Sequence, residues 1–233
     1  MEDYERQVKL KFKLLATFYD LFEIPLLLNE KGNPRYALAR KIPNEDLRIL
    51  DVCIGTGNSA IAVAEVNNRN EIVGVDLSPD MIAVAEKKIR RRRIRNISIR
   101  QMDATRMTFR DGEFDIAMIS FGLHELDYAL MMDILREMCR VLKESGKLYI
   151  VDIEREDGFL ENLVLSIYLK IFEPSHMPQF LRYDWVEILQ STRVQVTATE
   201  KYLFSKLICA VKQSNAERTT AQQAVAADLL RRE

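Results

Sequence analysis

The sequence is poor in the residues that build disulfide frameworks and metal clusters. Its 233 residues include only three cysteines, two histidines and one tryptophan. Cys53, Cys139 and Cys209 each lie in an apolar segment, and none belongs to a Cys-x-x-Cys pair. This usage predicts neither a disulfide framework nor a metal site, and it fits a reducing cytoplasm.

Charge of one sign and long apolar runs are also missing. The formal net charge is −1, so the overall charge gives no argument for nucleic acid as a partner. No run approaches the ~20 apolar residues of a membrane span, and the charged start MEDYERQVKLKFKLL lacks the apolar core of a signal peptide. We therefore expect a cytoplasmic protein without a transmembrane segment.

What is present is a regular alternation of apolar runs of strand length with helical patterns. Such alternation predicts an α/β fold in which crossover helices join parallel strands. Ser78 and Pro79 are a cap and first-turn pair that fixes the start of the helix after the second strand. The predicted strands are 47–52, 71–77, 97–102, 114–120 and 146–153, with a helix at 128–142 before the last of them.

The pattern changes after residue 153. Residues 158–173 are a very apolar helical stretch, 174–179 a loop bounded by two prolines, and 181–191 a further helix. Residues 193–203 and 204–212 are rich in β-formers and close enough to pair as a hairpin. The sheet should thus end in antiparallel strands.

A chain of this length has room for one domain with extensions. We expect that domain at residues 1–212, followed by a polar tail at 213–233. Its expected parts are a helical cap at 1–45, a cofactor-binding core at 46–153, a substrate cover at 154–191 and a hairpin at 192–212.

The clearest chemical signal is the glycine turn in LDVCIGTGNS, residues 50–59, after the first strand. In an open α/β sheet ligands bind beyond the carboxyl ends of the strands, where glycine lets the backbone approach them. Gly55, Gly57 and Asp76 also fit a dinucleotide fingerprint, which keeps NAD as an alternative ligand. Asp51 favours a cationic ligand, because its carboxylate would face the pyrophosphate of NAD. The sulfonium and ammonium groups of S-adenosylmethionine suit it.

Four ordered segments resemble the successive motifs of class I S-adenosylmethionine-dependent methyltransferases: LDVCIGTGNSAIAVAE, VGVDLSPDMIAVAEKK, IRQMDATRMTFRDGEFDIAMISFGLHEL and REMCRVLKESGKLYIVDI. The resemblance covers about residues 47–153. It implies a Rossmann-like, mostly parallel seven-stranded sheet with helices on both faces and a C-terminal antiparallel hairpin. Many members have glycine where this chain has Cys53.

The resemblance also implies where the cofactor binds. Asp51 and the glycine turn would line its methionine part, Asp76 its ribose, and Met81 and Asp103 its adenine. Tyr19 could close over the cofactor as a lid. In the alternative interpretation, Tyr19 is an aromatic residue of the core on an amphipathic helix. The expected cofactor-binding residues are Tyr19, Asp51, Gly55, Thr56, Gly57, Asp76, Leu77, Met81, Asp103, Ala104 and Ser120.

The segment SFGLHEL, residues 120–126, is similar to one in ubiquinone and menaquinone biosynthesis methyltransferases, where Arg-Asn follows Ser-Phe-Gly-Leu. His124 and Glu125 stand in its place here, so the acceptor can differ. A general base is needed only where the acceptor loses a proton, as a phenol or an enol-like ring carbon does. We predict catalytic or substrate-orienting roles for His124 and His176. In the alternative interpretation, His124 only bonds to the backbone at the start of a helix, and His176 is a solvated loop residue.

The function expected from these residues is methyl transfer from S-adenosylmethionine to a small apolar or aromatic acceptor, at carbon or oxygen, with S-adenosylhomocysteine as product. An NAD-dependent oxidoreductase and a non-catalytic S-adenosylmethionine-binding subunit are the alternatives.

Residues 158–173 could pack on the sheet, line an apolar substrate or touch a membrane. The basic run KKIRRRRIR at 87–95 is expected to be a solvated face, with RNA or anionic lipid as the alternative. A homodimer is compatible with the sequence.

Overall fold

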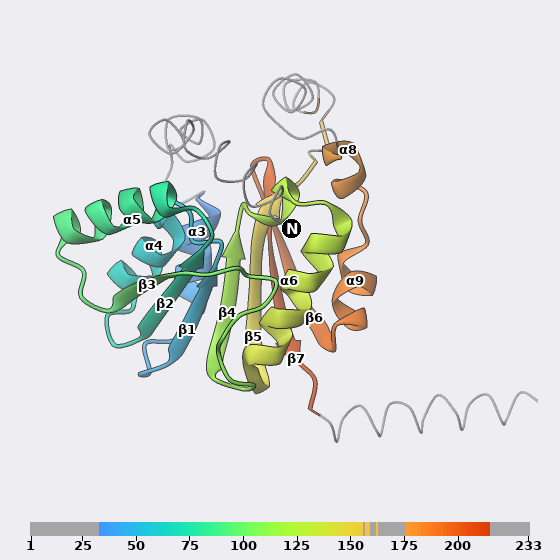
Figure 1. Ribbon diagram of the computed structural model, residues 1–233. Helices are drawn as coiled ribbons and strands as arrows, with labels where there is room; N and C mark the ends of the chain where they lie inside the picture. The colour runs from blue at the N-terminus through green and yellow to red at the C-terminus, as the bar shows by residue number, and fades with distance from the viewer. Residues whose placement is uncertain (1–32, 156, 159–161, 163–175, 215–233) are drawn as a thin grey trace, which may run out of the picture.

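The computed structural model describes residues 33–155, 157–158, 162 and 176–214. Within these residues, seven strands form one sheet in the order β3-β2-β1-β4-β5-β7-β6 (Figure 1). β7 is antiparallel to both of its neighbours, and the other neighbouring pairs are parallel. The strands are β1 (Arg48–Val52), β2 (Glu71–Asp76), β3 (Ile97–Gln101), β4 (Phe114–Ser120), β5 (Leu142–Ile153), β6 (Val194–Tyr202) and β7 (Ser205–Lys212).

Helices cover both faces of this sheet, which confirms the expected Rossmann-like α/β architecture. Figure 1 shows α6 in front of the sheet and α3 and α4 behind it. Strands covered on both sides bury nearly every residue, and β4 shows this with Phe114 and residues 116–119 inside the core. The helical elements are α3 (Pro34–Lys41), α4 (Asn58–Val66), α5 (Pro79–Arg92), the 3₁₀ turn η1 (Leu123–Glu125), α6 (Tyr128–Val141), α8 (Met177–Phe180) and α9 (Trp185–Ser191).

Short polar side chains fix where the helices begin. The Ser78 hydroxyl accepts the backbone N–H of Met81, and Pro79 is the first residue of α5, as the sequence predicted. Asp127 caps α6 and Asp184 caps α9 in the same way. Each cap satisfies an N–H that the helix itself leaves without a partner, so these starts are set locally.

Two boundaries differ from the prediction by more than one residue. β5 begins at Leu142 rather than at Gly146, because Leu142 already pairs with Phe114 before the register shifts. Ser145 has φ of +61°, so the polar residues before Gly146 lie inside the strand as an irregularity. The helix predicted at 181–191 begins only at Trp185, because the side chain of Asp184 caps it there.

The loop predicted at 174–179 is also corrected. Its described part contains α8, in which Pro178 is in the first turn. Proline fits there because a first-turn N–H has no partner within the helix. Residues 1–32, most of 158–173 and 215–233 lie outside the described residues, and with them the N-terminal part of the cap, nearly all of the apolar stretch and nearly all of the tail.

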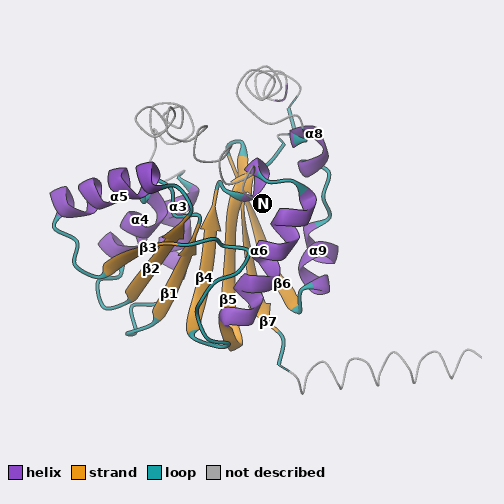
Figure 2. Cartoon of the chain, viewed as in Figure 1, coloured by secondary structure: helices purple, strands orange, loops and turns teal. Residues whose placement is uncertain are grey.

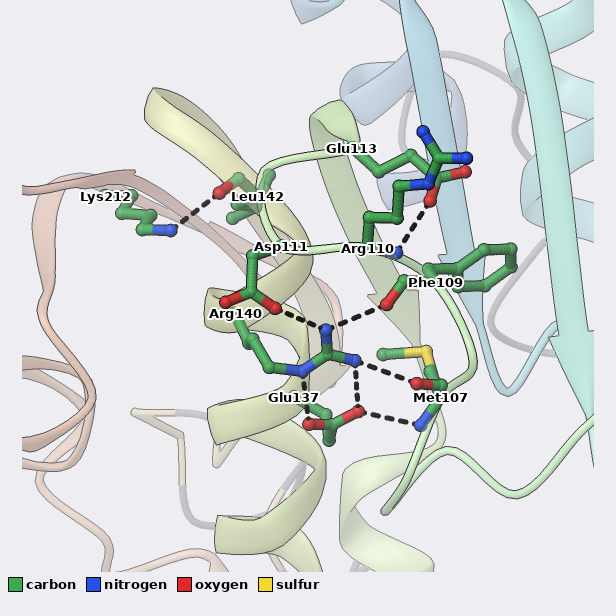
Figure 3. A network of polar contacts seen from close by, with 9 residues as sticks. All are labelled: Met107, Phe109, Arg110, Asp111, Glu113, Glu137, Arg140, Leu142 and Lys212. Atoms are coloured by element: carbon green, nitrogen blue, oxygen red, sulfur yellow. Dashed lines mark hydrogen bonds and ion pairs between the residues drawn. The ribbon is translucent and has the colours of Figure 1, made fainter.

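A network around Arg140 ties the loop before β4 to α6 (Figure 3). The Arg140 guanidinium donates to both carboxylate oxygens of Glu137, to the carbonyls of Met107 and Phe109, and to the carboxylate of Asp111, at 2.7–2.8 Å. Glu137 in turn accepts the N–H of Met107 at 2.7 Å. The loop that leads from β3 to β4 is thereby held on the helix that follows β4.

The sheet order defines one switch point, between β1 and β4. The helix after β1 and the helix after β4 lie on opposite faces, and at such a point the ligands of open α/β sheets bind beyond the carboxyl ends of the strands. In Figure 2 the arrow of β4 points to this upper edge. The glycine turn follows β1 and SFGLHEL follows β4, so both sequence signals meet at this edge.

Candidate active site

The glycine turn after β1 needs glycine for two different reasons. Gly55 has φ of +55°, and a Cβ there would have no neighbour among the described residues closer than the Cys53 carbonyl at 3.9 Å. Gly57 has φ of +83°, and a Cβ there would come within 3.1 Å of the Ala85 Cβ on α5. Gly55 therefore leaves open space beside the turn, whereas Gly57 lets α4 pack closely on α5.

Cys53 stands at the first bend of the same turn. Its φ is +54°, the left-handed region that glycine adopts most easily. The glycine that the family resemblance implies at this position would adopt this conformation without strain. A Cβ added at Gly122 would lie only 3.1 Å from the Cβ of Cys53. The glycine at position 122 therefore makes room for the cysteine side chain.

Asp76, at the end of β2, holds the turn in place. One carboxylate oxygen accepts the N–H of Gly55 at 2.8 Å and the other accepts the N–H of Ser78 at 2.9 Å. Burial raises the pKa of Asp76, against the lowering effect of these hydrogen bonds. Each oxygen keeps a further lone pair, so the same carboxylate is able to accept ribose hydroxyls as predicted.

Asp51 lies in β1 with 1% of its surface exposed. Burial raises its pKa to about 8, while the nearby charge of Arg35 and a backbone hydrogen bond from Ala60 act in the opposite direction. Among the described residues, Asp51 Oδ2 and Ser120 Oγ have no hydrogen-bond partner. A buried carboxylate oxygen that lacks a donor fits a cationic group such as an ammonium.

Arg35 of α3 was not singled out from the sequence. It is 5% exposed, its Nε donates to Ser59 Oγ at 3.1 Å, and its guanidinium lies 4.7 Å from the centre of the Phe121 ring. It places a positive charge near Asp51. No motif marked this arginine, because only the fold brings α3 against α4 and the end of β4.

Lys88 secures the turn from the side of α5. Its Nζ donates to Thr56 Oγ1 and Asn58 Oδ1, both at 2.9 Å. The hydroxyl of Thr56, a predicted cofactor contact, is thus engaged with a lysine of the basic run. Within that run, Arg90 pairs with Glu86 and Arg92 with Glu65, which is the behaviour of a solvated helix face.

The expected adenine side lies between the start of α5 and the end of β3. Met81 and Ala104 are buried, and Leu77 is half-buried at the end of β2. Asp103 accepts the N–H and hydroxyl of Thr105 at 2.9 and 2.8 Å, and the Arg106 Nε at 3.2 Å. Burial acts to raise the pKa of Asp103, but these bonds hold it below the ordinary value.

His124 forms a buried pair with Asp152, a residue that sequence reasoning missed. Nδ1 of His124 lies 2.5 Å from Asp152 Oδ1, and the two side chains are 4% and 0% exposed. The carboxylate of Asp152 also accepts two backbone N–H groups, that of Leu123 at 3.1 Å and that of its neighbour Ile153 at 2.8 Å. The sequence did contain a signal for Asp152. Like Asp51 and Asp76, it lies near the carboxyl end of a predicted strand, here LYIVDI.

His176 and His124 are 52 positions apart in sequence and meet in the fold. The Nε2 of His176 donates to the backbone carbonyl of His124 at 3.0 Å. Phe180 of α8 contacts the His124 ring, with the two ring centres 6.1 Å apart. Phe180 also contacts Tyr183 and Trp185, so aromatic side chains gather beside the histidine pair. Tyr19, the predicted lid, lies outside the described residues.

A family model described as a methyltransferase domain matches residues 49–146, the part of the chain that holds both signals. Residues 49–146 are thus similar to methyltransferase domains. A demethylmenaquinone methyltransferase of Bacillus cereus is 30% identical over 151 residues, 62% of this chain and 62% of that protein. One of Listeria welshimeri is 28% identical over 200 residues, 82% of each. The chain thus spans less than two thirds of the Bacillus cereus relative.

Solved structures agree with the methyltransferase domain in fold. A S-adenosylmethionine-dependent methyltransferase from Aquifex aeolicus has a TM-score of 0.63 at 18% identity, over 82% of this chain and 92% of that one. The cyclase SpnF has a TM-score of 0.70 at 18% identity, over 91% and 97%. The family model and the curated relatives bear out the resemblance to S-adenosylmethionine-dependent methyltransferases predicted from the motifs, and the solved structures bear out its fold.

Proposed function

We propose that the protein transfers a methyl group from S-adenosylmethionine to a small apolar or aromatic acceptor, at carbon or oxygen. The observation that carries this proposal is Asp51, a buried carboxylate with one oxygen lacking a donor among the described residues, directly before the glycine turn. In its ionised form an acidic residue there repels a pyrophosphate and attracts an ammonium group, whose positive charge would in turn lower the raised pKa of Asp51. The methyltransferase domain supplies the context in which such a residue binds this cofactor.

The residues present divide the binding of the cofactor between them. Asp51, Gly55 and Ser120 would face its methionine part, Asp76 its ribose hydroxyls, and Asp103 its adenine. When bound, S-adenosylmethionine supplies an activated methyl carbon, to which the acceptor atom bonds as the carbon–sulfur bond breaks and its electron pair stays on sulfur. The protein's own task is to place the acceptor in line and keep water away.

An aromatic acceptor is supported by the side chains beside His124. Tyr183 lies 5.8 Å from Phe180 and 5.4 Å from Tyr128 between ring centres, and Phe180 lies 5.5 Å from Trp185. Rings stack or meet edge to face with such groups, which favours a flat acceptor. The relatives named for demethylmenaquinone make a quinone-like compound the first to test, although His124 and Glu125 replace Arg-Asn in this segment.

Binding of S-adenosylhomocysteine by calorimetry is the first test. We expect saturable one-to-one binding to the full chain, and NADH should show none. Methyl-labelled S-adenosylmethionine with demethylmenaquinone, supplied in oxidised and in chemically reduced form, then tests the acceptor. Absence of binding at millimolar ligand would contradict the function, whereas binding without transfer to either form would reject only this acceptor.

The remaining expectations are proposals as well. No described helix is long and apolar enough to cross a membrane. A cytoplasmic location, a homodimer, peripheral membrane contact and the division of the chain into cap, core, cover, hairpin and tail stay predictions. The NAD-dependent oxidoreductase and the non-catalytic subunit receive no support from the relatives, which are methyltransferases by name.

A further inference from the structure

We propose that Asp152 is a positioning residue that fixes the proton of His124 on Nδ1 and so makes Nε2 the basic nitrogen of a general base. The inference rests on the proposed function and deepens it. A base of this kind serves an acceptor that must lose a proton, such as a phenol or an enol-like ring carbon, rather than one that attacks through a neutral amine or sulfur.

The hydrogen bonds of Asp152 determine the tautomer. Both Leu123 and Ile153 donate backbone N–H groups to this carboxylate, so its oxygens act as acceptors. A carboxylate oxygen 2.5 Å from His124 Nδ1 then requires that this nitrogen carry the hydrogen. Because one proton occupies Nδ1 in the neutral ring, the lone pair that can take another proton is on Nε2.

The surroundings keep the ring in this orientation. Rotation of His124 would break a charge-assisted hydrogen bond to a carboxylate that is 0% exposed, and burial makes such a loss costly. The backbone of the same residue is held by His176 Nε2 at 3.0 Å, and Phe180 contacts the ring. The pair thus combines a fixed tautomer with a fixed ring plane.

The proton balance follows from the proposed transfer. The acceptor loses one proton for each methyl group that it gains, and this proton passes to Nε2 of His124. The ring becomes an imidazolium, whose charge is offset by Asp152 without proton transfer to the carboxylate, and it later releases the proton to water. The titratable groups nearest to this pair along the chain are Glu125 of η1, Glu154 directly after β5 and His176 directly before α8, and Lys206 of β7 is paired with Asp152 in the sheet.

Nuclear magnetic resonance of ¹⁵N-histidine in the full chain tests the tautomer without any acceptor. Only two histidines are present, so a His176→Gln variant assigns the His124 signals. We expect a protonated Nδ1 and an unprotonated Nε2 in the neutral ring, with and without S-adenosylhomocysteine. A protonated Nε2 in the wild-type protein would overturn the proposal even if no variant folded.

Asp152→Asn supplies the second measurement, with Asp133→Asn as the matched control on the solvent side of α6, where the side chain is 51% exposed. Loss of the carboxylate should lower the pH midpoint of the His124 ring titration by about one unit or more. The affinity for S-adenosylhomocysteine should stay as in the wild type, because Asp152 is not among the proposed cofactor contacts. An unchanged tautomer and midpoint in Asp152→Asn would overturn the proposal.

A pH–rate profile connects this state of the ring to the reaction once an acceptor is in hand, with reduced demethylmenaquinone as the first probe. The acid limb of kcat should follow the ring midpoint in the wild type and move with it in Asp152→Asn. His124→Gln should lower kcat by about 10²-fold or more, the usual share of a general base. If S-adenosylhomocysteine binds but the midpoint of the acid limb of kcat is the same in Asp152→Asn as in the wild type, the assignment of His124 as the base fails. The proposed methyltransferase function would still stand.

Discussion

Four carboxylates lie at or near the carboxyl ends of the parallel strands, and the structure gives each a different task. Asp51 is buried before the glycine turn, Asp76 ties that turn to the end of β2, Asp103 orders its own loop, and Asp152 holds His124. Burial raises the pKa of Asp51 and Asp76, whereas Asp103 lies below its ordinary value. Environment rather than residue type thus separates their roles.

Asp51 should make the unliganded protein less stable as the pH rises. Burial raises its pKa to about 8 in the folded state, from the ordinary value of 3.8 for an aspartate side chain. Below both values the carboxyl is protonated in both states, so it adds no pH dependence. Between about pH 4 and pH 8 the unfolded chain gives up this proton while the folded protein keeps it, so the free energy of unfolding falls.

The substitution Asp51→Asn should remove this loss, which is on the order of a few kcal/mol between about pH 5 and pH 8. Urea unfolding at the two pH values measures it, with Asp133→Asn as a variant of an exposed carboxylate. If Asp51→Asn and the wild type lost the same stability over this range, Asp51 would not have a raised pKa.

Asp76→Ala should weaken binding of S-adenosylhomocysteine by about 10- to 100-fold, because hydrogen bonds to a charged acceptor contribute about 1.5–3 kcal/mol. It should also lower the free energy of unfolding, since Gly55 and Ser78 lose the acceptor of their N–H groups. Calorimetry and urea unfolding measure the two effects. A stability loss with unchanged affinity would show that Asp76 only ties the turn and that the ribose binds elsewhere.

At the scale of the elements, loops are held by a few side chains that reach backbone groups. Arg140 binds two carbonyls of the loop between β3 and β4, and Lys88 binds the glycine turn from α5. Asp152 similarly joins η1 to β5 through the N–H of Leu123. These contacts fix loops that carry site residues to helices and strands of the core.

Arg140→Met should lower the free energy of unfolding by about 2–3 kcal/mol, because several hydrogen bonds of about 0.5–1.5 kcal/mol each are lost and two loop carbonyls lose their donor. Arg136→Met on the same helix is the control, since its ion pair with Asp133 is exposed and contributes at most about 0.5 kcal/mol. Urea unfolding compares them. Equal losses in the two variants would mean that the network does not hold the loop.

At the scale of the whole molecule, the sheet order determines which segments form the site. Because β1 and β4 are neighbours, the glycine turn and SFGLHEL share one edge although about 60 residues separate them. The C-terminal part of the chain adds α8, which brings His176 to the same place. A ligand that spans this edge contacts segments from distant parts of the sequence and should stabilise them together.

S-adenosylhomocysteine at about 100 times its dissociation constant should therefore raise the free energy of unfolding by about 2.7 kcal/mol. Thermal unfolding with and without the ligand measures the shift, and NADH at the same concentration should cause none. Asp76→Ala should need more ligand for the same effect. A midpoint raised by NADH and not by S-adenosylhomocysteine would favour the oxidoreductase instead.

The sequence predicted most of the local structure, because local chemistry fixes it. Ser78 and Pro79 start α5, alternating apolar runs set the strands, and glycines mark the turn after β1. The boundaries it missed depend on partners far along the chain. β5 starts early because Leu142 meets Phe114, and that pairing exists only when the sheet forms.

The candidate site divides in the same way. The sequence by itself identified the strand-end acids Asp51, Asp76 and Asp103 and the two histidines, because residue type and position after a strand are local properties. Only the tertiary structure assigned Asp152 to His124 and joined His176 to the His124 carbonyl, since these contacts span 28 and 52 positions. Burial decided the rest: a carboxylate that water would keep ionised takes a pKa of about 8 at Asp51 only because the folded chain excludes water from it.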